Sequence, residues 1–90
     1  MSDPLPPGLD PRRRRLLYRA THRGTHEADL LVGGFVARHV AAMTDADLTA
    51  TEAVLEHPDV DLADWLTGRR PVPPDADTPL LRRMCAAAGQ

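Results

Sequence analysis

The sequence has few aromatic residues, a single cysteine and no long hydrophobic run. Its three aromatic side chains (Tyr18, Phe35 and Trp65) are too few for the stacking platforms of single-strand nucleic-acid binders or for the strands of a β-sandwich. One cysteine, Cys85, allows neither an internal disulfide nor a zinc site of Cys/His spacing. The longest stretch without a charged residue, 30–37, is too short to span a bilayer. We therefore expect a reduced protein with no metal and no membrane partner.

Lysine is absent, so all eleven basic residues other than histidine are arginine. The net charge is −2, but residues 1–43 hold seven arginines against four acidic residues, whereas residues 44–90 hold four against nine. Four arginines are consecutive: Arg12, Arg13, Arg14 and Arg15. This arginine run could contact phosphates, as basic arms do. Because the chain is acidic overall and no second basic stripe follows, we favour a solvated helical turn with two arginines facing a protein partner, and we expect no nucleic-acid partner.

The length of 90 residues predicts one domain. Residues 1–9 are proline-rich without hydrophobic periodicity, which predicts a disordered lead-in to a single helical domain over 10–90. The start resembles neither a signal peptide nor a transit peptide, so we expect a cytoplasmic protein of bacterial type.

Capping residues, prolines and glycines divide the remaining chain into five predicted helices. They cover about 11–22, 25–43, 45–57, 61–68 and 79–88, with Asp10, Thr44, Asp61 and Thr78 as starting caps and Gly24, Pro58, Gly68 and Gly89 as stops. Thr44 and Asp47 have the spacing of a capping box. No strand pattern is present, so the predicted fold is all-α, a compact five-helix bundle.

Apolar residues recur every three or four positions in each predicted helix, which is typical of helices that bury one face. The predicted core residues are Leu16, Leu17, Ala20, Ala28, Leu31, Val32, Phe35, Val36, Val40, Met43, Leu48, Thr51, Val54, Leu55, Leu62, Trp65, Leu66, Leu80, Leu81, Met84, Cys85 and Ala88. Two adjacent glycines, Gly33 and Gly34, interrupt the longest helix, and we expect them to mark the close approach of another backbone.

The sequence contains no constellation of residues that would make it an enzyme. His22 and His26 have the i, i+4 spacing of metal ligands, but Gly24 between them breaks the helix that would place them together. Cys85 lies on a core-facing stripe, where cysteine is a small hydrophobe rather than a nucleophile. We therefore predict no catalytic and no metal-binding residue.

The segment from Arg23 to Glu27 is the most informative, because a guanidinium and a carboxylate flank an exposed glycine within one turn. On physical grounds alone, a helix stop with an acidic residue near the next helix start explains it. However, Tyr18-Arg19-Ala20, Arg23-Gly24-x-x-Glu27-x-Asp29-Leu30 and Asp61-Leu62-x-x-Trp65-Leu66 together resemble the SdhE family, also called succinate dehydrogenase assembly factor 2 or flavinator. The resemblance covers about residues 11–88.

The resemblance implies a five-helix bundle that is not an enzyme but an FAD assembly factor. Such a protein binds the flavoprotein subunit of succinate dehydrogenase, with fumarate reductase flavoproteins as further clients, and promotes covalent attachment of FAD. It implies that FAD is the client's cofactor, that this chain holds none stably and that the free protein is a monomer. The partner-binding residues implied are Tyr18, Arg19, Arg23, Gly24, Glu27 and Asp29.

Two other functions stay open at this point. One is a small helical nucleic-acid binder that uses the arginine run, and the other is an antitoxin-like adaptor. Co-purification separates them from the assembly factor, because each hypothesis names a different partner.

Overall fold

Eight helical segments make up the part of the chain that the computed structural model describes, residues 8–89. They are α1 (Pro11–Thr21), α2 (His26–Ala28), the π-helix η1 (Asp29–Gly33), α3 (Gly34–His39), the 3₁₀ turn η2 (Val40–Ala42), α4 (Asp45–Val54), α5 (Asp59–Leu66) and α6 (Pro79–Ala87). Because α2, η1, α3 and η2 follow one another without a break, these residues form five helical bodies and no strand. The predicted all-α five-helix bundle is confirmed. No helix among the described residues is both long and apolar enough to cross a membrane.

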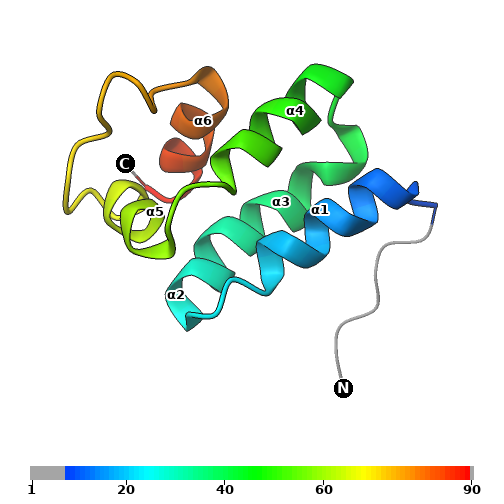
Figure 1. The fold of residues 1–90 in the computed structure, drawn as a ribbon, viewed down its shortest axis with the longest axis horizontal. Helices are drawn as coiled ribbons and strands as arrows, with labels where there is room; N and C mark the ends of the chain where they lie inside the picture. The colour runs from blue at the N-terminus through cyan, green and yellow to red at the C-terminus, as the bar shows by residue number, and fades with distance from the viewer. Residues whose placement is uncertain (1–7, 90) are drawn as a thin grey trace.

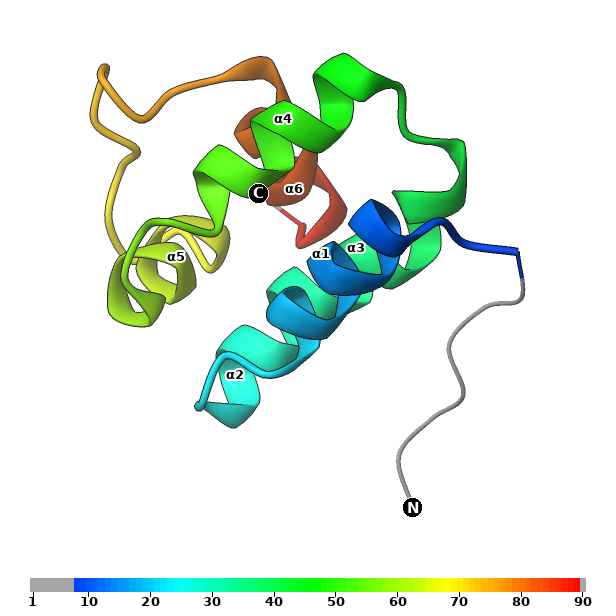
Figure 2. The same cartoon turned by 45° about the vertical axis from the view of Figure 1, so that its right-hand side comes forward.

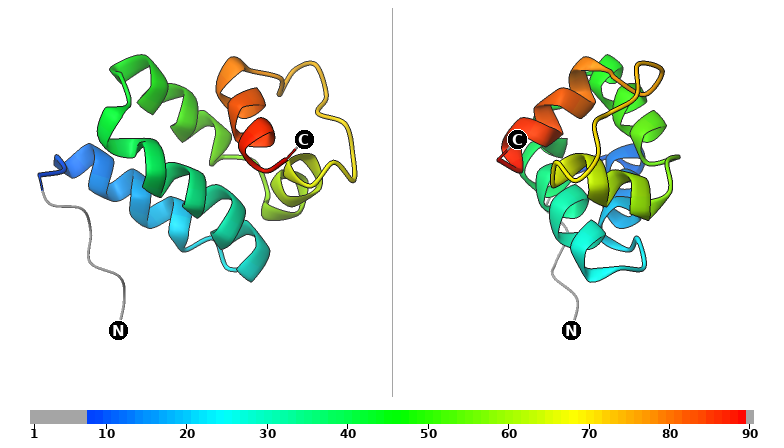
Figure 3. Two further views of the ribbon diagram at one scale, coloured as in Figure 1. Left: turned by 180° about the vertical axis from the view of Figure 1, so that it is seen from behind. Right: turned by 90° about the vertical axis from the view of Figure 1, so that its left-hand side faces the viewer.

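The five bodies are arranged around an antiparallel pair. Figure 1 shows α1 running alongside the rod formed by α2, η1 and α3, and the view from behind in Figure 3 shows the same pairing. Helix α4 returns over the other end of this pair and packs against α6, as Figure 2 shows. Helix α5 lies against α2 and η1 at the end of the molecule where α1 stops. The turn between α1 and α2 is therefore next to the start of α5.

The helix ends follow the local capping chemistry closely. The Asp10 side chain accepts a hydrogen bond from the Arg13 backbone N–H at 3.2 Å, and Thr44 and Asp47 form both hydrogen bonds of a capping box. One predicted cap is wrong: α5 begins at Asp59, directly after Pro58, so Asp61 lies inside its first turn. The fixed φ of proline suits a helix start, and Pro58 therefore begins α5 more than it ends α4.

The core contains the predicted apolar residues. Of that set, Leu31, Cys85 and Ala88 are only partly buried but pack against the core, and the others are buried. Trp65 is 6% exposed, which confirms its core position. Leu9, the last residue of the expected lead-in, also packs into the core cluster. The rest of that lead-in, apart from Gly8, lies outside the described residues.

The two adjacent glycines have different surroundings. A Cβ on Gly33 would lie 3.0 Å from the Ala20 carbonyl oxygen and 3.0 Å from the Thr21 Cγ2, whereas a Cβ on Gly34 would meet nothing within 4 Å. The predicted close approach is confirmed at Gly33 and is wrong at Gly34. Gly33 thus lets η1 lie directly against the end of α1.

Two of the four consecutive arginines, Arg12 and Arg13, make hydrogen bonds to other parts of the fold. Arg12 donates to both carboxylate oxygens of Glu52, at 2.7 and 3.1 Å, and Arg13 donates to the backbone carbonyls of Val40 and Met43. Only Arg14 and Arg15 are exposed. The expected solvated turn is therefore limited to these two residues, because Arg12 and Arg13 join α1 to α4 and to the end of η2.

Candidate partner-binding site

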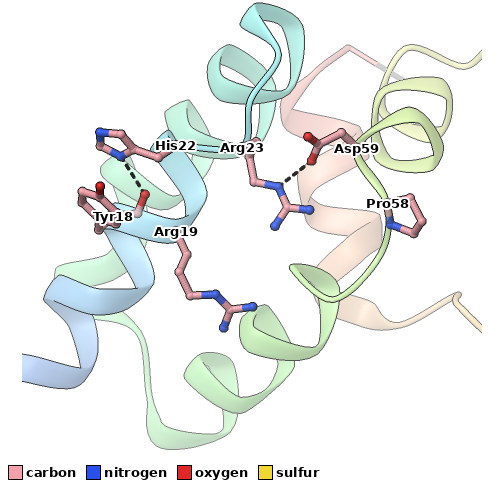
Figure 4. Close-up of a pocket in the computed structure, with 6 residues that line it drawn as sticks. All are labelled: Tyr18, Arg19, His22, Arg23, Pro58 and Asp59. Carbon is pink, nitrogen blue, oxygen red and sulfur yellow. Dashed lines mark hydrogen bonds and ion pairs between the residues drawn. The ribbon is translucent and has the colours of Figure 1, made fainter.

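The turn that joins α1 to α2 collects the six residues implied as a partner-binding set. Tyr18 and Arg19 lie in the last turns of α1, Arg23 and Gly24 in the turn itself, Glu27 in α2 and Asp29 at the start of η1. Figure 4 shows the side of this corner that faces Pro58 and Asp59.

Local hydrogen bonds fix the backbone of the turn. Gly24 has φ +105°, a value that a residue with a Cβ rarely adopts, so glycine is required there. The Asp29 carboxylate accepts a hydrogen bond from the Arg23 backbone N–H at 2.6 Å, and the Thr25 hydroxyl accepts one from the Ala28 N–H at 3.2 Å. Asp29 is therefore directed into the turn, where it stabilises the conformation that Gly24 permits.

The Arg23 side chain points inward. Its guanidinium donates to the Asp59 carboxylate at 2.7 Å, to the Leu55 carbonyl at 2.7 Å and to the His57 carbonyl at 2.8 Å, and only 10% of the side chain is exposed. Cations are favourable at the carboxyl end of a helix, and carboxylates at the amino end. Arg23 satisfies the end of α4 while Asp59 occupies the start of α5, so this pair joins the turn to both helices (Figure 4).

A hollow of about 410 Å³ lies beside this ion pair, lined by Tyr18, Arg19, His22, Arg23, Pro58 and Asp59. The Tyr18 ring is 59% exposed and stacks on the His22 ring, with 3.9 Å between centroids. Arg19 reaches Glu56 only at 3.6 Å. A loosely held guanidinium beside an exposed aromatic ring can receive an acidic side chain from another protein.

Gly24 and Glu27 lie on the exposed surface of the same corner. A Cβ on Gly24 would meet only the Asp59 Oδ2, at 3.9 Å, so this backbone is open to a partner. The Glu27 carboxylate is about half exposed and accepts a hydrogen bond from Arg69 at 2.6 Å. Tyr18, Arg19, Gly24 and Glu27 are thus accessible, while Arg23 and Asp29 bond mainly within the chain.

Sequence reasoning did not identify the residues that complete the site, His22, Pro58, Asp59 and Arg69. Only Asp59 had a local signal, since an acidic residue after a proline is typical of a helix start. Within residues 8–89 no group of three or more histidine, cysteine or acidic side chains could hold a metal ion.

Comparisons with known proteins agree with the resemblance in the sequence. A family model described as "Flavinator of succinate dehydrogenase" matches residues 14–88. The chain is 55% identical over 76 residues to the FAD assembly factor SdhE of Acetobacter pasteurianus, an alignment that covers 84% of this chain and 70% of that protein.

Two mitochondrial proteins are more distant. The chain is 41% identical over 59 residues to succinate dehydrogenase assembly factor 2 of Candida glabrata, covering 66% of this chain and 39% of that protein. It is 40% identical over 77 residues to succinate dehydrogenase assembly factor 2-A of Drosophila ananassae, covering 82% and 49%. The chain therefore spans about half or less of these mitochondrial relatives.

Proposed function

Because the chain belongs to the family of flavinators of succinate dehydrogenase, we propose that it is an FAD assembly factor. It binds the flavoprotein subunit of succinate dehydrogenase, and flavoproteins of fumarate reductases as further clients, and promotes the covalent attachment of FAD to them. The match over residues 14–88 carries this proposal, because it includes all six residues of the candidate site. The higher identity to the bacterial relative supports action in a bacterial cytoplasm.

The proposed role is that of a helper and not of an enzyme. The bond joins a histidine nitrogen of the client to the 8α-methyl carbon of its flavin. The nitrogen and the methyl carbon each lose a proton and the flavin ring system takes up the two electrons, so every reacting group belongs to the client. This chain adds the selection of a client conformer in which the two groups meet. Cys85 supports the assignment, since burial raises the pKa of its thiol, whose S–H donates to the Trp65 carbonyl at 3.7 Å. A thiol in this state is a poor nucleophile.

The proposed contact surface is the accessible part of the corner: Tyr18, Arg19, Gly24 and Glu27. Gly24 lets the client's backbone approach, and the charged pair supplies charge-assisted hydrogen bonds. Arg23 and Asp29 act through the shape of the turn, because their polar groups are used inside the chain. The nucleic-acid alternative is weakened, since Arg12 and Arg13 are engaged with α4 and η2.

The test is flavin fluorescence from the denatured flavoprotein band, measured in cells that express the client with and without this chain. We expect wild type to restore the fluorescence, and Arg19→Ala and Glu27→Gln to reduce it. Arg82→Ala is the matched control, because Arg82 is an exposed arginine on α6 that pairs with Asp77 in the segment before that helix. Fluorescence that does not depend on the wild-type chain would refute the proposed function.

A further inference from the structure

Glu27 in α2 lies at one end of a chain of five alternating charges that passes through two arginines after α5 and ends at Asp61 in the first turn of α5. Arg69 donates to the carboxylates of Glu27 and Asp64, at 2.6 and 3.1 Å. Arg70 donates to Asp64 at 2.7 Å and to Asp61 at 2.5 Å. The sequence separation between Glu27 and Arg69 is 42 residues, so this contact exists only in the folded domain.

The charges in this chain do not balance. Three carboxylates face two guanidinium groups, which leaves a net charge of −1. Asp64 and Asp61 alone would neutralise both arginines, and Asp64 already contacts each of them. Glu27 is therefore the surplus carboxylate, and its side chain is 47% exposed. A second cation can share Glu27 without leaving either arginine unpaired.

The geometry at Glu27 also leaves room for a second donor. Arg69 donates through Nη2 to Oε1, and no other donor within residues 8–89 hydrogen-bonds to this carboxylate. An ionised carboxylate has about four acceptor positions on its two oxygens. One hydrogen bond from Arg69 thus orients the group, while Oε2 accepts no hydrogen bond from the described residues.

We propose that Arg69 is a positioning residue that holds Glu27 to receive one cationic side chain, an arginine or a lysine, of the client flavoprotein. This inference rests on the proposed function and names the chemistry of the client at the same site. A single positive charge is the expected partner, because it brings the five-charge cluster to neutrality. Arg69 acts through Glu27 and need not touch the client.

The experiment measures the affinity of the purified flavoprotein subunit for Glu27→Gln, Arg69→Ala and the double variant. Because the proposed hydrogen bond joins two charged groups, Glu27→Gln should lower the affinity about 10- to 100-fold. Arg69→Ala should lower the affinity about fivefold, because Arg69 is coupled to the client only through Glu27. The double variant should bind like Glu27→Gln alone, because Arg69 has no effect once the carboxylate is absent.

Two further measurements separate this role from a structural one. Arg69→Ala should melt within a few degrees of wild type, since an exposed ion pair contributes little to stability. The charge exchange Glu27→Arg with Arg69→Glu keeps an ion pair inside the chain but reverses the charge offered to the client, so it should fold and fail to bind. Wild-type affinity should fall with salt, and Glu27→Gln should flatten that dependence.

The outcomes also separate this inference from the proposed function. If wild type does not bind the flavoprotein, the proposed function fails. If wild type binds and Arg69→Ala binds equally well, or if the two single losses add in the double variant, the positioning role is refuted while the proposed function stands. Wild-type affinity for the charge-exchange variant would refute a cationic client group. Arg82→Ala is again the control and should bind like wild type.

Discussion

Replacing Arg23 with alanine should destabilise the whole domain. The guanidinium makes three hydrogen bonds to groups 32 to 36 residues away, and its side chain is 10% exposed. The variant would leave the Asp59 carboxylate without its cation and two backbone carbonyls at the end of α4 without their donor. Each of these groups lies at a junction between helices, so the loss reaches beyond the turn.

The magnitude follows from the burial of the two partners. Removing one member of a buried ion pair costs about 3–5 kcal/mol. The Asp59 side chain is 23% exposed, so water compensates part of this loss, and we expect about 2–4 kcal/mol. A domain of this length has a total stability of about 5–13 kcal/mol. The melting temperature should therefore fall by at least about 10 °C.

Urea unfolding followed by the fluorescence of Trp65, the single tryptophan, measures this change. Arg23→Lys keeps the charge but loses the planar set of donors, so it should lie between wild type and Arg23→Ala. Arg19→Ala is the control, an exposed arginine near the same helix end that should stay within about 0.5 kcal/mol of wild type. An Arg23→Ala variant as stable as this control would refute the structural role and return Arg23 to the list of client contacts.

Three further predictions concern the rest of the domain. Gly33→Ala should lower the free energy of unfolding by about 1–3 kcal/mol because the added Cβ meets α1, whereas Gly34→Ala should raise it by about 0.5–1 kcal/mol. Equal effects of the two substitutions on the urea midpoint would contradict the close packing at Gly33. Trp65→Ala should cost about 3–5 kcal/mol, and a melting temperature within a few degrees of wild type would exclude a core position. The hydrogen bond from Arg12 holds the pKa of Glu52 below its ordinary value. The pair therefore stabilises the fold fully at pH values above the ordinary pKa, and this contribution is lost as the pH falls through the lowered pKa. Between pH 7 and 3, the melting temperature should fall only below about pH 4.5, and it should fall less in Glu52→Gln than in wild type. An equal fall in the two proteins would refute the contribution of the pair.

The helices could be predicted from the sequence because the signals that begin and end each of them are local. Thr44 and Asp47 cap α4 with atoms three residues apart, and Asp10 caps α1 through the Arg13 N–H at the same spacing. The error at Asp61 has a local cause as well, since Pro58 suits both the end of one helix and the start of the next. Hydrophobic periodicity identified the core because each helix buries one face.

The candidate site could be located from the sequence but its geometry could not. Whether Arg23 points toward a partner or into the chain depends on Leu55, His57 and Asp59, and nothing near Arg23 in the sequence indicates them. Arg69 is equally remote from Glu27. Long-range hydrogen bonds of this kind have no periodicity, so they become visible only when the helices are placed in space.

The anchoring of the turn by α4 and α5 has a consequence for synthesis of the chain. Helices α1 and α2 leave the ribosome before α4 and α5, and the acceptors of the Arg23 guanidinium, at positions 55, 57 and 59, emerge 32 to 36 residues after Arg23 itself. Local hydrogen bonds hold the backbone of the turn, but the Arg23 side chain has no fixed position until α5 has begun to form. A nascent chain or a fragment ending before residue 59 therefore lacks the ion pair that joins the turn to the start of α5.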